Sequence, residues 1–240
     1  MAEPVLSLRF DEPIAVIGDI HGSAEQLRAL LARLPKSTPI LVAGDLCDRG
    51  PDTRGVLDLL VERGARGVLG NHDEWLLAWA RGEGFDRVAL SPMMAGEATL
   101  KSYGVEGRGT SEVEAQRWRV PAAHLAFLDG LATVIDLEVI GERFWLTHAG
   151  VPMTEPLAGL RMEEVVPRLA RANPAVLRWP STDPESMLPL DRPVIMGHMP
   201  QRRARDTGDV IAIDTGAGTC APWRLTAVVL PERIFVAVER

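Results

Sequence analysis

Cysteine is almost absent from this chain of 240 residues, which contains only Cys47 and Cys220, and neither belongs to a Cys-x-x-Cys pair. Two such distant cysteines provide neither a disulfide framework nor a thiolate zinc site. No uninterrupted apolar run approaches the roughly 18 residues of a membrane-spanning helix, and the first residues lack the basic start and apolar stretch of a signal peptide. We therefore expect a protein of the reducing cytoplasm that does not associate with membranes.

Basic residues are fewer than acidic residues. The chain has 26 Lys and Arg residues against 33 Asp and Glu residues, which gives a formal net charge of −7. A broad basic surface for nucleic acid is therefore excluded, and nucleic acid is not an expected partner. An acidic protein that handles anions needs a local positive centre, and bound metal ions can supply one.

Strand-like and helical patterns alternate in the first part of the chain. Short β-branched runs at 13–18, 39–44 and 66–70 are followed by helical patterns at 23–34, at 52–64 and from about residue 74. This alternation indicates βαβ units. Residues 83 to about 130 have no strand-like alternation and read as a helical insertion, the later part is rich in strand-like runs, and 179–193 is a proline-rich loop. We expect one α/β domain over 1–240, with two layers of β-structure.

Polar residues gather where the predicted strands end. The segments GDIHG (18–22), GDLCDRG (44–50), GNHD (70–73), THAG (147–150) and GHMP (197–200) each follow an apolar run. In an open α/β sheet the loops at the carboxyl ends of the strands converge and form the ligand crevice. These segments are therefore expected to lie close together in space.

Histidine is concentrated in the same segments. Of the five histidines, His21, His72, His148 and His198 stand at predicted strand ends, whereas His124 lies in a predicted helix. A single histidine in such a place would carry little information, but four of five in equivalent positions indicate a shared function. His124 is interpreted as an ordinary polar position. Trp75 and Trp79, four residues apart after GNHD, are expected to pack in the core.

The strand-end residues have the composition of a metal site without thiolates. Mixed carboxylate, imidazole and amide ligands suit divalent ions such as Mn²⁺, Fe²⁺ or Zn²⁺. The candidate ligands are too many for one tetrahedral ion and divide naturally between two: Asp19, His21, Asp45, Asn71, His148 and His198. Two metals roughly 3.5–4 Å apart, bridged by a carboxylate and a hydroxide, promote in-line displacement at phosphorus. The chain accordingly has no GxSxG or P-loop pattern.

The five segments, in this order, resemble the motifs of the calcineurin-like metallophosphoesterases. More narrowly, they are similar to GDxHG, GDxxDRG, GNHE, HAG and a late GH in the phosphoprotein phosphatases of the bacterial serine/threonine type. The resemblance extends from residue 18 to residue 218. It implies a two-sheet β-sandwich flanked by helices, with a dimetal site at the carboxyl ends of the strands.

The resemblance also implies a division of the ligands. One ion would be bound by Asp19, His21 and Asp45, and the other by Asp45, Asn71, His148 and His198. Asp45 would then bridge the two ions. Mn²⁺ is the first choice of metal, with Fe or Zn as alternatives.

The same resemblance assigns catalytic and substrate-binding roles. His72 would be the general acid that protonates the leaving oxygen, and Asp48 would orient its imidazole. Arg49 would bind phosphoryl oxygens through its planar fork. A second phosphate-binding arginine is assigned to Arg178, with Arg192 as the rival.

The function implied first is that of a metal-dependent phosphomonoesterase, a serine/threonine protein phosphatase in which a metal-bridging hydroxide attacks the phosphoester. The alternative is a symmetrical diadenosine tetraphosphate hydrolase, because Asp73 stands where protein phosphatases usually have Glu. Asp48 argues the other way, since those hydrolases tend to lack it. A binding scaffold without turnover is a third reading, but no ligand is missing. The expected partner is a phosphoprotein or a small phosphorylated substrate.

Overall fold

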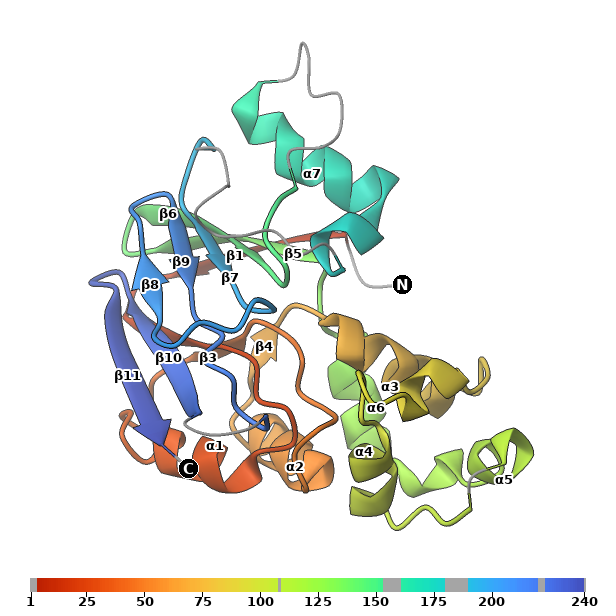
Figure 1. Cartoon of the computed structure of the whole chain (residues 1–240). Helices are drawn as coiled ribbons and strands as arrows, with labels where there is room; N and C mark the ends of the chain where they lie inside the picture. Colours follow the sequence, from red (N-terminus) through yellow and green to blue (C-terminus); the bar gives the residue numbers. More distant parts are fainter. Residues whose placement is uncertain (1–3, 108, 153–160, 180–189, 220–222, 240) are drawn as a thin grey trace.

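The computed structural model describes residues 4–107, 109–152, 161–179, 190–219 and 223–239. Cys220 and most of the proline-rich loop 179–193 lie outside this part of the chain. Two β-sheets face one another, with helices on their outer sides (Figure 1). The predicted α/β fold, two sheets flanked by helices, is confirmed.

The first sheet has five strands in the order β11-β10-β2-β3-β4. Strands β2 (Ile14–Ile17), β3 (Ile40–Val42) and β4 (Arg66–Gly67) run parallel, as the alternating pattern predicted. Strand β10 (Arg224–Leu230) pairs antiparallel with β2, and β11 (Ile234–Glu239) pairs antiparallel with β10. The three parallel strands therefore end at the same edge, which is where the first three polar segments begin.

The second sheet has six strands in the order β1-β5-β6-β7-β9-β8. Its members are β1 (Val5–Phe10), β5 (Val134–Val139), β6 (Glu142–Thr147), β7 (Val194–Met196), β9 (Val210–Ala212) and β8 (Arg205–Asp206). Strands β5 and β6 form an antiparallel hairpin, and β6, β7 and β9 run parallel. Strands β6 and β7 thus bring THAG and GHMP to one edge.

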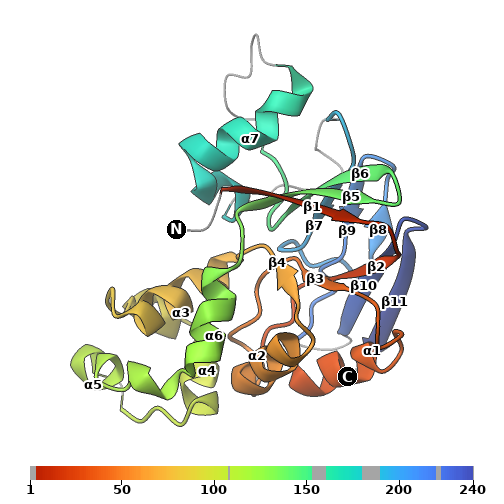
Figure 2. The same ribbon diagram turned by 180° about the vertical axis from the view of Figure 1, so that it is seen from behind.

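Helices cover both outer faces and one side of the sandwich. Helices α1 (Ala24–Leu31) and α2 (Thr53–Glu62) lie under the five-stranded sheet, and α7 (Met162–Ala172) with η3 (Pro174–Leu177) lies on the six-stranded sheet (Figure 2). The remaining helices form a group beside the sheets: α3 (Asn71–Arg81), η1 (Arg87–Leu90), α4 (Glu97–Ser102), α5 (Thr110–Glu114), η2 (Arg117–Arg119) and α6 (Ala122–Asp129). Residues 83–130 are accordingly helical and contain no strand among the residues described.

The alternation of side chains along the strands divides the core into layers. On β2, Ile14 and Val16 pack between the sheets, whereas Ala15 and Ile17 pack toward the helices of the first sheet. Trp145 on β6 faces the layer that contains α7. Burying each large apolar side chain contributes about 1.5–3 kcal/mol. These layers hold the strands rigidly, so the loops that leave them start from fixed positions.

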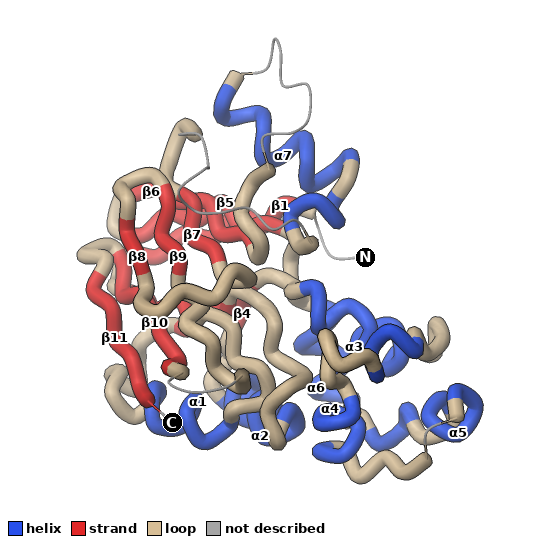
Figure 3. Tube along the Cα trace, in the orientation of Figure 1, coloured by secondary structure: helices blue, strands red, loops and turns tan. Residues whose placement is uncertain are grey.

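The loops in tan in Figure 3 gather between the sheets and α3. Helix α3 begins at Asn71, three residues earlier than the sequence pattern predicted. Asp73 Oδ2 accepts from the backbone N–H of Gly70 at 3.0 Å, which satisfies a donor at the start of the helix. Asn71 and His72 therefore lie in the first helical turn, at the end of β4. No helix in the described part of the chain has the length and apolarity to cross a membrane.

Candidate functional site

The backbone of the strand-end loops is left-handed at several polar residues. The φ angles are +43° at His21, +52° at Asp45, +72° at Asp48, +59° at Arg49 and +66° at His198. Such angles are uncommon outside glycine and cost on the order of 1–3 kcal/mol each, so they persist where surrounding structure enforces them. Their concentration in three loops marks this edge of the sheets as a candidate functional site.

Two glycines let these loops approach one another closely. A Cβ on Gly44, whose φ is +97°, would lie 2.6 Å from the backbone N of Gly70 and 2.8 Å from His148 Nδ1. A Cβ on Gly197 would lie 2.0 Å from Asp19 Oδ1. Any larger residue would separate the loops, so these glycines set the spacing of the polar side chains.

Asp45 belongs to two groups of potential metal ligands. The first contains His21, Asp45 and His72, and the second contains Asp45, His148 and His198; in each, the ligand atoms lie within 4.8 Å of one another. Asp45 Oδ2 is 3.6 Å from His21 Nε2, and Asp45 Oδ1 is 3.3 Å from His148 Nε2. One carboxylate thus faces both groups, as expected of a bridging ligand.

The ligand atoms of the second group lie close to His148 Nε2. His148 Nε2 lies 3.0 Å from Asn71 Oδ1 and 3.2 Å from His198 Nδ1, in addition to its contact with Asp45. Burial would lower the pKa of His148, but Asp45 and Asp19 outweigh that effect and raise the pKa to about 10. A proton therefore stays on His148 among acceptor atoms until a cation replaces it. The donor set fits a divalent ion.

Backbone carbonyls orient two of the imidazoles. His21 Nδ1 donates to the carbonyl of Cys47 and His148 Nδ1 donates to the carbonyl of Ala43, both at 2.8 Å. Because a carbonyl only accepts, Nδ1 must carry hydrogen in both rings and Nε2 faces the centre. This is the arrangement in which a histidine presents Nε2 to a metal.

The pKa values of two further histidines favour the neutral form. Burial, reinforced by the positive charge of Arg49, lowers the pKa of His21 to about 3. Burial, with His148 nearby, lowers the pKa of His198 to about 4. Neutral imidazoles keep a lone pair for a cation, so both residues are suited to ligation at neutral pH.

Asp19 belongs to neither group of three, but it lies beside His198. Its two carboxylate oxygens accept from the backbone N–H of His198 at 3.1 and 3.0 Å. Burial raises the pKa of Asp19 well above its ordinary value, and the neighbouring carboxylates Asp214 and Asp45 add to the effect. Burial also opposes ionisation of Asp45, yet the charge of His148 holds the pKa of Asp45 well below its ordinary value. A cation would relieve this crowding of carboxylates.

His72 differs from the other imidazoles in its partner. Its Nδ1 donates to Asp48 Oδ2 at 2.8 Å, so a carboxylate rather than a carbonyl fixes the ring. Asp48 is fully buried and also accepts from Trp75 Nε1 at 2.9 Å and from the Thr99 hydroxyl at 2.8 Å. A carboxylate held in this way can stabilise an imidazolium at His72. The geometry suits proton transfer better than simple ligation.

Arg49 lies across the first group. Its Nη1 donates to His21 Nε2 at 2.7 Å and its Nη2 donates to His72 Nε2 at 3.1 Å. The guanidinium therefore engages the lone pairs of both rings, and it has to turn away before a cation can bind His21. Its planar fork of N–H donors matches the oxygens of an anion.

The two arginines weighed as a second phosphate ligand differ in position. Arg178 follows η3, and its Nε donates to Glu74 Oε1 at 2.7 Å, one turn along α3 from Asn71. Arg192 precedes β7, stacks on Trp145 with its guanidinium carbon 4.3 Å from the ring centroid, and pairs with Asp136. Arg192 thus lies at the opposite end of β7 from His198. Arg178 remains the candidate.

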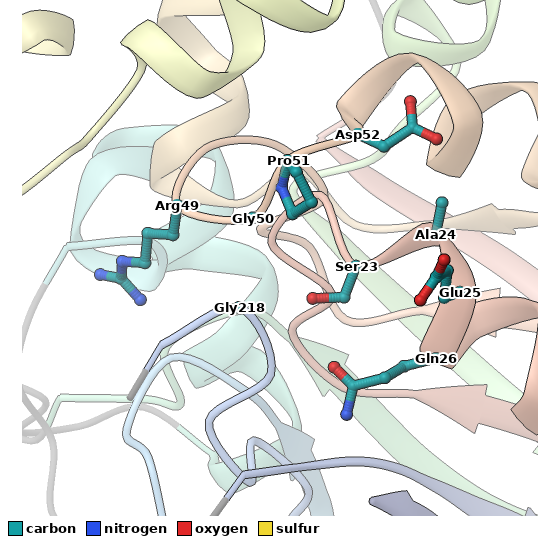
Figure 4. A pocket seen from close by; sticks show the side chains of 9 residues that line it. All are labelled: Ser23, Ala24, Glu25, Gln26, Arg49, Gly50, Pro51, Asp52 and Gly218. Atoms are coloured by element: carbon teal, nitrogen blue, oxygen red, sulfur yellow. The ribbon is translucent and has the colours of Figure 1, made fainter. Parts of the chain in front are cut away.

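A pocket of about 210 Å³ opens beside Arg49 (Figure 4). The Ser23 hydroxyl and the Gln26 amide border it at the start of α1, with Gly218 on the facing loop. Arg49 points away from the other labelled side chains in the same view. Its guanidinium contacts His21 and His72. The pocket therefore adjoins the centre and can accept a part of the substrate that extends beyond the reacting group.

The structure brings Asp19, His21, Asp45, Asn71, His148 and His198 to one edge of the sheets together with His72, Asp48 and Arg49, whereas their roles stay predictions. His124 lies elsewhere, between the Tyr103 hydroxyl and Asp58, each at 2.9 Å. Sequence reasoning missed Thr99 and Asp214. Thr99 carries no signal in its own segment, but Asp214 follows an apolar run and precedes a glycine-containing turn, as the other site carboxylates do.

A family model described as calcineurin-like phosphoesterase matches residues 12–224. A symmetrical bis(5'-nucleosyl)-tetraphosphatase from Ralstonia nicotianae is 49% identical over 74 residues, which cover 29% of this chain and 26% of that protein. The chain spans about a quarter of the length of the curated relatives it matches.

Two solved structures share the fold. The crystal structure of a protein proposed to be a diadenosine tetraphosphatase has a TM-score of 0.63 at 22% identity, covering 98% of this chain and 97% of that one. A protein serine/threonine phosphatase from Saccharomyces cerevisiae has a TM-score of 0.60 at 13% identity, covering 100% of this chain and 84% of that one. At these identities the likeness concerns the fold alone.

Proposed function

This chain belongs to the calcineurin-like phosphoesterases, and we propose that it hydrolyses a dinucleoside tetraphosphate symmetrically, with two divalent cations bound at the strand ends. In this reaction one water cleaves the central phosphoanhydride and two nucleoside diphosphates leave. The observation that carries the proposal is the position of Asp45, which faces both groups of ligand atoms, with His72 4.0 Å from its Oδ2. A phosphorus centre placed there would meet a general acid and two cation sites at once.

Asp45 would hold both cations, joined by Asp19 and His21 on one side and by Asn71, His148 and His198 on the other. When bound, such ions supply an activated water and neutralise the charge that develops on phosphoryl oxygens. Mn²⁺, Fe²⁺ and Zn²⁺ are all compatible with carboxylate, imidazole and amide donors. Mn²⁺ is our first choice.

His72 and Asp48 would handle the proton. With Nδ1 committed to Asp48, His72 can carry its second proton only at Nε2, on the side that faces Asp45 and Arg49. A proton at that atom can pass to the oxygen of the leaving nucleoside diphosphate. Asp48 keeps the ring oriented and stabilises its charged form without itself being protonated.

Arg49 and Arg178 would bind the substrate anion. Arg49 can exchange its contacts with two neutral imidazoles for charge-assisted contacts with phosphoryl oxygens, which are about twice as strong. Arg178 pairs with Glu74, one turn along α3 from Asn71, and would exchange that partner for phosphoryl oxygens. A long polyphosphate offers more anionic oxygens to these groups than a single phosphoester does.

The choice of a dinucleotide is supported by the name of the curated relatives and by Asp73. Asp73 is fully buried, and its Oδ1 accepts from the backbone N–H of Leu46 at 2.8 Å. It thereby ties the start of α3 to the loop that carries Asp45. Burial, with Asp45 nearby, raises the pKa of Asp73 to about 6. Asp73 would therefore hold the two loops in position without taking part in the reaction.

A phosphoprotein is the second candidate substrate, and Asp48 is the observation that favours it. A serine or threonine alkoxide is a poor leaving group and needs protonation, whereas a nucleoside diphosphate leaves readily. The elaborate support of His72 by Asp48 would matter most for an alkoxide. The protein would then be a serine/threonine phosphatase with the same metal centre.

Product analysis tests the proposal. The protein is incubated with Mn²⁺ and diadenosine tetraphosphate, and the nucleotides are separated by chromatography. The expected result is ADP as the only product, at two molecules per substrate consumed. Formation of AMP and ATP would contradict symmetrical cleavage, and an intact substrate alongside phosphate release from a phosphoserine peptide would favour the second candidate.

A further inference from the structure

A second pocket, of about 230 Å³, opens beside Asn71. Helix α3, the turn η1 and Trp179 border it, and its described lining residues differ from those of the pocket beside Arg49. Because Asn71 also contacts His148, the pocket begins at the candidate metal centre. Its volume lies below the roughly 300–1,000 Å³ of sites for drug-sized ligands, so it fits one moiety of a larger substrate.

Trp179 stands at the mouth of this pocket in a fixed orientation. Its Nε1 donates to Glu74 Oε2 at 2.7 Å, and the other oxygen of Glu74 accepts from Arg178. The residue nevertheless remains 46% exposed. Its polar edge is thus satisfied within the protein, while a large part of its ring is presented to solvent.

The remaining walls are apolar on one side and acidic at the edge. Val88, which is 56% exposed, and Met94 contribute apolar surface beside the exposed ring of Trp179. Glu74 and Asp86 contribute carboxylates. Glu74 already accepts from Arg178 and Trp179, and Asp86 accepts from the backbone N–H of Val88, but each carboxylate has further lone pairs that can accept from a ligand. The matching ligand is flat, apolar on its faces and equipped with N–H donors at its edge.

We propose that this pocket binds one nucleobase of the substrate, stacked on Trp179, with an exocyclic amino group directed toward the carboxylates of Glu74 and Asp86. The phosphates of the same nucleotide reach the centre past Asn71. This inference rests on the proposed function for its choice of ligand. It assigns Trp179 as a specificity-determining residue that takes no part in the chemistry.

The rival occupant is an apolar side chain of a phosphopeptide, next to the phosphorylated residue. Such a side chain brings no donor for the remaining lone pairs of the two carboxylates. A nucleobase satisfies both features of the pocket, and we therefore favour it.

The test measures binding without turnover, so that it remains informative if the protein fails to hydrolyse dinucleotides. Isothermal titration calorimetry of the Mn²⁺-loaded protein compares ADP, IDP and inorganic pyrophosphate. ADP and pyrophosphate share the diphosphate, and IDP replaces the amino group of adenine by a carbonyl. The variants are W179A, W179F and, as a matched control, W118A, whose tryptophan is 71% exposed on η2 and lines neither pocket.

ADP is expected to bind the wild-type protein about 5- to 150-fold more tightly than pyrophosphate, the range that stacking of one base provides. IDP should bind more weakly than ADP. W179A should bind ADP no more tightly than pyrophosphate, with its affinity for pyrophosphate unchanged. W179F should retain much of the affinity advantage of ADP over pyrophosphate, and W118A should retain all of that advantage.

Equal affinity for ADP and pyrophosphate in the wild-type protein would overturn the proposal, as would equal affinity for ADP and IDP. An advantage of ADP that survives in W179A would place the base elsewhere. A W179A variant that weakens binding of a phosphoserine peptide but not of ADP would assign the pocket to the rival occupant. Failure of the proposed hydrolysis would appear separately, as absence of ADP formation from the dinucleotide.

Discussion

The candidate metal centre around Asp45 differs in construction from the pocket bordered by α3, η1 and Trp179, which we call the rim. Asn71 belongs to both. In the centre most polar side chains are buried, and backbone carbonyls orient two of the histidines. Several of these residues have positive φ angles. At the rim an aromatic ring is exposed and only its edge is fixed. In our proposal the two parts have different tasks: the centre would carry out the reaction, and the rim would select the molecule that undergoes it.

The largest effect is expected from Asp45→Asn. Removing the charge that faces both ligand groups should prevent binding of the two cations and reduce turnover of every substrate to background. Mn²⁺ titration and hydrolysis of p-nitrophenyl phosphate measure both effects. The control is Asp129→Asn, since Asp129 lies on the surface and pairs with Arg81. Substantial activity in the Asp45 variant would contradict the bridging role.

His72→Asn separates chemistry from binding within the centre. General acid catalysis contributes about 10²–10⁴-fold, so turnover of a phosphoserine peptide should fall by that factor. Turnover of p-nitrophenyl phosphate should fall much less, because nitrophenolate leaves without a proton. Equal losses on both substrates would indicate that His72 acts as a ligand, as its place in the first group of donors also permits.

Gly44→Ala tests whether the spacing of the loops is specific to the centre. The new Cβ would combine a left-handed penalty with a clash against Gly70, so we expect a loss of about 2–5 kcal/mol in the free energy of unfolding. Gly64 is the matched control, since its φ is +59° and a Cβ added there would meet no atom within 4 Å, and Gly64→Ala should cost about 1–2 kcal/mol. Chemical denaturation compares the two, and equal losses would show that crowding at Gly44 is unimportant.

The smallest effect concerns the support of Asp48. Trp75→Phe removes one hydrogen bond to the Asp48 carboxylate, which is worth about 1.5–3 kcal/mol and therefore about a 12- to 160-fold loss in turnover of the phosphoserine peptide. Trp79→Phe on the same helix removes a bond to the carbonyl of Val113 instead, and should alter stability but not turnover. Equal turnover in the two variants would deny Trp75 a positioning role.

The residues of the centre could be predicted because they lie in short glycine-containing segments that follow predicted strands. The alternation of strand-like and helical patterns predicted the parallel strands β2, β3 and β4, and the family resemblance implied the two-sheet sandwich. Sequence reasoning missed β1, with its alternating VLSLRF, and the two-residue strand β8. The sequence pattern also identified Trp75 and Trp79 as core residues, and both are buried. What it could not reveal is that the indole of Trp75 reaches Asp48.

The rim was not predictable, because its parts come from separate segments that meet only through tertiary packing. Trp179 contacts Glu74 across 105 positions of sequence, and Arg178 contacts Glu74 across 104. No local period or motif encodes such a meeting. The motifs alone favoured a protein phosphatase, whereas the curated relatives are named symmetrical bis(5'-nucleosyl)-tetraphosphatases.

The most direct test of the account is the ratio of kcat/KM for diadenosine tetraphosphate to that for a phosphoserine peptide, measured on one Mn²⁺-loaded preparation. We predict that the dinucleotide is the better substrate and that two molecules of ADP form from each. A higher kcat/KM for the phosphopeptide, with the dinucleotide left uncleaved, would contradict the account.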